Sequence, residues 1–148
     1  MPLRQISLLF RQAPRTLARR DLRGFADVLF GMVAQERAFT CLITRDAELQ
    51  RLNREFLGHD YPTDVLSFPS GESEGPLGDI AISADRAADQ ATEFGHSLEA
   101  EIKILMLHGV LHLMGMDHES DSGEMARGER RWRKKLGLPQ ALIERVNA

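Results

Sequence analysis

Residues 102–118 read IKILMLHGVLHLMGMDH, and this stretch decides more about the chain than any other. From Ile102 to Met114 it is almost wholly apolar, and a helix that is apolar all round is a buried one. Ser97 is the predicted N-cap of this helix, with Glu99 and Glu101 near its positive end. Gly115 is the predicted C-terminal stop. The sequence therefore predicts one long buried helix.

Two histidines lie inside this helix. His108 and His112 are four residues apart, which puts both imidazoles on the same helix face. Burying polar groups without partners costs on the order of 1–3 kcal/mol each. The burial of two histidines on one apolar face therefore needs a common explanation. Gly115 allows a left-handed turn that would bring His118 back to the same point. The pattern H-x3-H-x2-G-x2-H thus predicts a metal site, with satisfied core histidines as the alternative.

Three histidine ligands leave one tetrahedral position of a zinc ion open, as in catalytic sites. The spacing equals the metzincin protease pattern H-E-x-x-H-x-x-G-x-x-H. Gly109, however, stands where those proteases carry the glutamate that acts as general base. The site is therefore predicted to activate water by another route, with phosphodiesters as the first substrates to consider. A metallopeptidase-like hydrolase is the alternative.

The rest of the chain alternates strands with helices. Strands are predicted at residues 5–10, 39–44, 65–68 and 79–83. Further helices are predicted at residues 14–38, 46–57, 84–94 and 127–135, with Asp46 and Ser83 as N-caps of the second and third. The polar loop 69–76 joins two strands that form a hairpin or pair with other neighbours. We expect a single domain, residues 1–148, of the α/β class (α+β type) with one small sheet.

The composition is that of an ordinary globular protein, with 43% hydrophobic and 28% charged residues among 148. The single cysteine, Cys41, excludes an internal disulfide and is predicted to lie in the core. No apolar run approaches the ~18 residues that span a bilayer, and the start lacks the features of a signal peptide. The sequence predicts a soluble intracellular protein.

Positive charge gathers in two segments, although the net charge is −3. Residues 1–23 carry six arginines against one acid, and residues 127–135 carry six Lys or Arg against one glutamate. If both lie on one face, they favour a polyanionic partner; otherwise they are solvated helix faces. Trp132, inside the second segment, either stacks on a base or packs on the core.

The histidine stretch also carries a family resemblance. H-G-x-L-H-L-x-G-x-D-H at residues 108–118 resembles the signature of the bacterial YbeY family, metal-dependent endoribonucleases of ribosomal RNA maturation. Residues 52–69 resemble its L-N … D-x-P-T-D-V-L-S-F-P segment, and residues 77–83 match L-G-D-I-x-I-S. Glu101 sits where the family carries an acid. One position departs: Leu57 stands where the family often has an arginine, which leaves Arg54 or the basic termini to contact phosphate.

The resemblance implies a small mixed sheet flanked by helices, and His108, His112 and His118 as ligands of one Zn²⁺ per chain, with no other cofactor. It implies a cytoplasmic, single-strand-specific endoribonuclease of 16S rRNA 3′-end maturation and ribosome quality control. The partners would be single-stranded ribosomal RNA and small-subunit components of the ribosome, and no membrane. The alternative is a non-catalytic assembly factor whose structural zinc takes a fourth ligand such as Asp117.

Beyond a metal-bound water, the catalytic acid or base is open between three carboxylates. Asp117 either orients a ligand histidine or caps a turn. Glu101 lies nearly two helical turns before His108. It either supports a ligand histidine from behind the site or is an acid of the first turn favoured by the helix dipole. Asp64 begins a strand, where capping is the simpler role. Ser67 and Asp79 could line a groove or have only structural roles in their strands. His59 and His96 are predicted to be surface residues.

Overall fold

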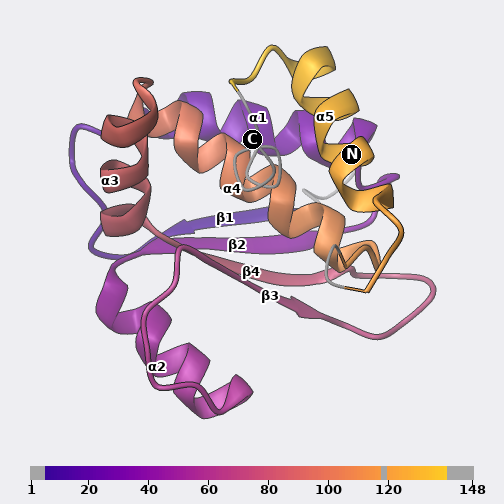
Figure 1. The fold of residues 1–148 in the computed structure, drawn as a ribbon, viewed down its shortest axis with the longest axis horizontal. Helices are drawn as coiled ribbons and strands as arrows, with labels where there is room; N and C mark the ends of the chain where they lie inside the picture. The colour runs from indigo at the N-terminus through magenta and orange to yellow at the C-terminus, as the bar shows by residue number, and fades with distance from the viewer. Residues whose placement is uncertain (1–5, 118–119, 140–148) are drawn as a thin grey trace, which may run out of the picture.

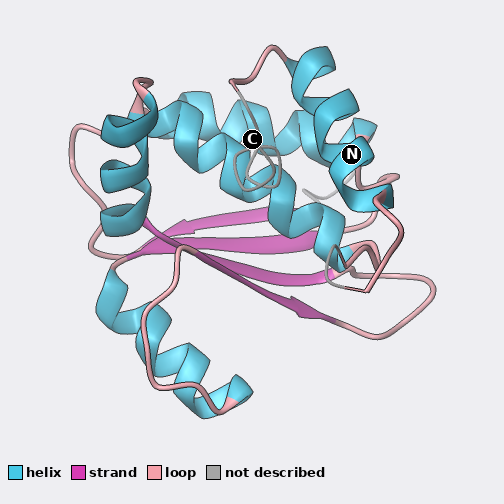
Figure 2. Ribbon diagram, viewed as in Figure 1, coloured by secondary structure: helices cyan, strands magenta, loops and turns pink. Residues whose placement is uncertain are grey.

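The structure, a computed structural model, describes residues 6–117 and 120–139. Figure 2 shows its helices and strands. In chain order they are β1 (Ile6–Phe10), α1 (Arg19–Met32), β2 (Phe39–Thr44), α2 (Asp46–Leu57), β3 (Val65–Pro69), β4 (Gly78–Ser83), α3 (Ala84–Phe94), α4 (Leu98–Leu113) and α5 (Glu124–Leu136). The predicted α/β class with one small sheet is confirmed.

The sheet is mixed, with the strand order β1-β2-β4-β3. β1, β2 and β4 are parallel to one another, while β3 pairs antiparallel with β4. Of the two pairings that the sequence leaves open for these strands, the structure shows the hairpin. Gly78 opens β4 with φ of +140°, and a Cβ there would stand 2.2 Å from the carbonyl oxygen of Phe68. Only glycine can bring the two strands this close at the mouth of the hairpin.

The helices are divided unequally between the two faces of the sheet. Figure 1 shows α1, α3, α4 and α5 on one face and α2 alone on the other. Alternate strand residues, among them Cys41, Ile43 and Ile82, enter the main core beneath the four helices. Leu49 of α2 forms a second, small cluster with Leu66 and Ala81. The core position predicted for Cys41 is confirmed, and burial raises the pKa of its thiol to about 12.

The helix ends agree with the sequence in part. The hydroxyls of Ser83 and Ser97 accept from the backbone N–H of Arg86 and Ala100 at 3.1 and 3.0 Å, as expected of N-caps. The N-cap predicted at Asp46 is wrong. Asp46 is the first residue of α2, and its carboxylate accepts a 2.6 Å hydrogen bond from the Ser83 hydroxyl, which a tertiary contact alone could arrange.

The first helix, α1, is shorter than the helix that its apolar pattern predicts. α1 covers only the middle of the predicted range 14–38, because a turn at Pro14 to Leu17 precedes it and positive φ values at Gln35 and Glu36 follow it. Among the described residues, no helix is both long enough and apolar enough to cross a membrane. The long apolar helix α4 is instead the centre of the main core, with eleven buried residues.

Candidate metal centre

His108 and His112 lie together at the C-terminal end of α4. Their rings meet edge to face, with centroids 4.7 Å apart and planes at 72°. His108 is buried, with 5% of its surface exposed, whereas His112 is half-buried. The predicted placement of both imidazoles on one helix face is therefore confirmed. Two neighbouring imidazoles at different depths can serve one ion that is reached from outside.

A carboxylate on another helix holds the deeper ring. Nδ1 of His108 lies 2.7 Å from Oε1 of Glu129, a residue of α5 with no exposed surface. With Nδ1 engaged in this bond, Nε2 is the nitrogen that can coordinate a metal. This is the arrangement in which metal-binding histidines are usually supported, and the donor set therefore fits a zinc ion.

Sequence reasoning missed Glu129, because it counted this residue only as the one acid in a basic run. A signal was available in the spacing of α5. Met125, Gly128 and Trp132 recur at the interval of one helix face, and Glu129 lies between them. Met125 and Gly128 are buried and Trp132 packs against the core, so this face carries Glu129 inward.

The turn after α4 begins as predicted. Gly115 has φ of +95°, and the backbone N–H of Met116 donates to the carbonyl of Leu111 at 3.1 Å. The carbonyl of Asp117 accepts from the backbone N–H groups of Ser120 and Asp121. The third predicted ligand, His118, lies outside the described residues. Within residues 6–117 and 120–139, no three His, Cys, Asp or Glu side chains are grouped so that they could hold a metal ion.

Gly109, the residue that distinguishes this motif from the protease motif, lies where α4 crosses β4. A Cβ at Gly109 would stand 2.9 Å from Cγ2 of Ile80, which is itself buried. The Ser67 hydroxyl donates to the Gly109 carbonyl at 3.3 Å and ties β3 to the same point. A side chain at this position would press on Ile80, so the glutamate that serves as general base in a metzincin would require Ile80 to shift.

The three carboxylates considered for catalysis lie in different settings. Glu101 is fully buried and lies 2.6 Å from Nε2 of His96, so the surface position predicted for His96 is wrong. The pair joins α4 to the loop before it. Asp64 accepts from the Val65 N–H at 2.7 Å and from the Gln90 amide at 3.0 Å, which is a capping role. Asp117 is exposed, between the helix and His118.

Other candidates lie away from the histidines. Leu57 is exposed at the end of α2, and Arg54 is within 3.4 Å of Asp60. His59 is exposed, as predicted. Asp79 is on the second face of the sheet, because the alternate residues Ile80 and Ile82 enter the core beneath α4.

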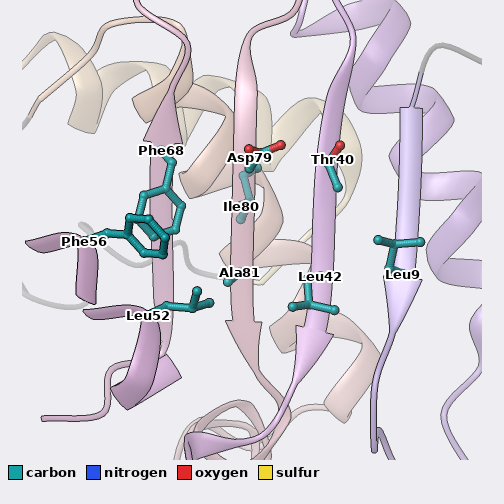
Figure 3. A pocket seen from close by; sticks show the side chains of 9 residues that line it. All are labelled: Leu9, Thr40, Leu42, Leu52, Phe56, Phe68, Asp79, Ile80 and Ala81. Atoms are coloured by element: carbon teal, nitrogen blue, oxygen red, sulfur yellow. The ribbon is translucent and has the colours of Figure 1, made fainter. Parts of the chain in front are cut away.

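That second face carries a groove of about 400 Å³ beside α2. Figure 3 shows its lining, in which the rings of Phe56 and Phe68 lie edge to face with centroids 5.8 Å apart. Leu9 and Leu42 form the opposite wall, and Asp79 is the one charged residue in the lining. Since a phosphate chain needs cations, this apolar groove is a poor match for an RNA backbone.

Within the described residues, Arg19, Arg20 and Arg23 of the first basic segment are in α1, on the same side of the sheet as α5 (Figure 1). Arg11 instead lies 3.7 Å from Glu48 of α2, which covers the other face. α1 and α5 both pack on α4, on the helix-covered face (Figure 1). The guanidinium groups of Arg19 and Arg23 lie 4.7 and 5.0 Å from the ring centroid of Phe10. Trp132 packs against the core, with Lys135 Nζ 5.4 Å from its ring centroid. Trp132 is therefore mainly a packing residue.

The chain is similar to known proteins over most of its length. A family model described as "Endoribonuclease YbeY" matches residues 16–137. An endoribonuclease YbeY of Solibacter usitatus is 62% identical over 143 residues, covering 96% of this chain and 95% of the relative. One from Nautilia profundicola is 52% identical over 105 residues, covering 70% and 76%. The solution structure of TM1509 from Thermotoga maritima matches with a TM-score of 0.61 and 28% identity, over 86% of this chain and 85% of that one.

Proposed function

The chain belongs to the YbeY family of endoribonucleases, and we propose that it is a zinc-dependent member that cuts single-stranded ribosomal RNA. Family membership carries the endoribonuclease activity. The zinc ion is assigned to His108, His112 and His118. The resemblance in the sequence also points to 16S rRNA 3′-end maturation and ribosome quality control as the setting, with the cytoplasm and the small ribosomal subunit as its place.

The observation that supports the zinc site most directly is the pair of imidazoles backed by a buried carboxylate. His108 and His112 have ring centroids 4.7 Å apart, and Glu129 holds the deeper ring at 2.7 Å. A purely structural core histidine needs a partner for its polar atoms, but it does not need a second imidazole beside it. This pairing therefore favours ligands over core histidines.

The roles of the residues follow from their positions. His108 and His112 would bind the ion from α4, and Glu129 would orient His108. When bound, zinc supplies a Lewis acid that polarises a phosphoryl oxygen and makes nearby water more acidic. Of the three candidate carboxylates, Asp117 is the exposed one, and in this proposal it would exchange a proton with the substrate. The half-buried His112 marks the side from which RNA would approach.

The peptidase alternative is disfavoured by packing. A metzincin needs a glutamate directly after its first ligand histidine. Here that position is Gly109, and even one added carbon would press on the buried Ile80 side chain. The site is therefore built for a reaction that does not need this base.

The test is cleavage of a labelled single-stranded ribosomal RNA fragment by the zinc-loaded protein. We expect cutting by the wild type, loss of cutting in His112→Ala and in chelator-treated protein, and recovery of the treated protein when zinc is returned. His59→Ala is the matched control, because His59 is an exposed histidine outside the site. Equal cutting by the wild type and His112→Ala would contradict the proposal.

A further inference from the structure

We infer that Glu129 is a positioning residue of the metal centre, whose carboxylate fixes the orientation and proton arrangement of His108. The inference rests on the proposed zinc site and names a residue that the sequence motif does not contain. Glu129 lies 21 positions after His108, on a different helix, and the two side chains meet at 2.7 Å. It would act on the metal through His108.

The burial of this contact is the first argument. Glu129 has no exposed surface and His108 has 5%. Placing a carboxylate out of water costs several kcal/mol unless a partner compensates it, so a buried glutamate is retained for what it contacts. Packing of α5 on α4 through Met125 and Gly128 holds this carboxylate in place. A rigid helix pair therefore sets the direction of the His108 ring.

The chemistry of imidazole is the second argument. A neutral imidazole carries one N–H, and a carboxylate that accepts at Nδ1 selects the form with the proton there. The lone pair is then on Nε2, which is the form a metal ligand requires. Glu129 therefore prepares His108 to bind before the ion arrives.

The chain offers a matched control on α4, the helix that carries His108. Glu101 is also a fully buried carboxylate, and it lies 2.6 Å from a histidine, His96. His96 belongs to the loop before α4 and is not among the proposed ligands. Removing the charge of Glu101 thus reproduces the loss of a buried carboxylate–histidine pair without touching the metal centre.

The experiment measures zinc affinity by competition with a chelator, with Co²⁺ absorption as a second probe. Glu129→Gln keeps an acceptor oxygen but loses the charge, and we expect about tenfold weaker binding. Glu129→Leu loses both, and we expect up to about 100-fold weaker binding. Glu101→Gln is expected to bind zinc like the wild type. Wild-type affinity in both Glu129 variants would overturn the inference, and if Glu129→Leu does not fold, Glu129→Gln decides.

Two readouts separate positioning from general stability. In the metal-free wild type, imidazole ¹⁵N shifts of His108 should show the proton on Nδ1, and Glu129→Gln should shift this balance. In a His108→Ala background, Glu129→Gln should have no further effect on zinc affinity. An equal loss with and without His108 would overturn the inference.

RNA cutting is scored separately from zinc binding. A wild type that binds zinc as described but cuts no RNA removes the nuclease proposal and leaves the role of Glu129 intact. Normal RNA cutting together with unchanged zinc affinity in the Glu129 variants removes the role of Glu129 and leaves the nuclease proposal intact. A wild type that binds no zinc removes both.

Discussion

Gly109 of α4 lies so close to Ile80 of β4 that a Cβ on the glycine would stand 2.9 Å from Cγ2 of Ile80. His108 and His112, the two histidines of the proposed site, are on the same helix as this contact. The contact leaves little room for a side chain at the position where the proteases carry their glutamate. Helix and sheet approach this closely because glycine has no side chain.

Substituting this glycine should destabilise the fold. We expect Gly109→Ala to lower the free energy of unfolding by about 1–3 kcal/mol, as overpacking of a core usually does. Gly24→Ala is the control, because Gly24 is also inside a helix but has nothing within 4 Å of its added Cβ. There the alanine should stabilise by roughly 0.5–1 kcal/mol. Urea denaturation measures both, and equal effects of the two substitutions would contradict this account.

The loop end of the β3–β4 hairpin should tolerate substitution of its glycine still less than the position of Gly109 does. Gly78 combines φ of +140° with a space in which a Cβ would meet the Phe68 carbonyl at 2.2 Å. Backbone cannot move aside as the end of a side chain can, so we expect Gly78→Ala to cost more than Gly109→Ala. Thermal unfolding of the two variants side by side gives the order. A smaller loss for Gly78→Ala would show that β3 and β4 can separate freely at this end.

Zinc should stabilise the folded chain through the proposed ligands. An ion that binds only the folded state at 100 times its dissociation constant adds about 2.7 kcal/mol to the free energy of unfolding. We expect this gain in the wild type and its loss in His112→Ala, measured by urea denaturation with and without zinc. A gain of the same size in His112→Ala would place the ion elsewhere.

Alkaline pH should act on stability through Cys41. Burial raises the pKa of this thiol from 9.0 to about 12 in the folded chain. Above pH 9 the unfolded chain loses the Cys41 proton while the folded chain keeps it, so the unfolded state becomes more stable relative to the folded state. The free energy of unfolding should therefore fall by about 1.4 kcal/mol per pH unit between the two pKa values. Cys41→Ala should lack this component, and identical pH dependence in the two proteins would count against it.

RNA binding should depend on the exposed cations of α5. Lys134 and Lys135 are both exposed at its C-terminal end. If each contacts a phosphate, the double alanine variant should lower the slope of log affinity against log salt by about 1.4, at about 0.7 for each contact with a single strand. Arg51→Ala is the control, since Arg51 of α2 already binds Glu48 and Glu55. An unchanged slope in the double variant would remove α5 from the RNA interface.

The sequence by itself determined the local features. Apolar alternation and turn residues were enough for the four strands and for most helix ends, because these depend on neighbours a few residues away. Ser83, Ser97 and Gly115 behave as their residue types predict. The spacing of His108 and His112 also sufficed to put them on one face, since four residues make about one helical turn.

Only the tertiary structure decided what joins distant segments. Asp46 binds Ser83, 37 residues away, instead of capping its own helix. Glu129 meets His108 because α5 packs across the end of α4, and no local pattern states which helices will cross. Hydrophobic burial is non-directional, so the sequence specifies which faces are buried, and the packed core alone selects which buried polar groups meet.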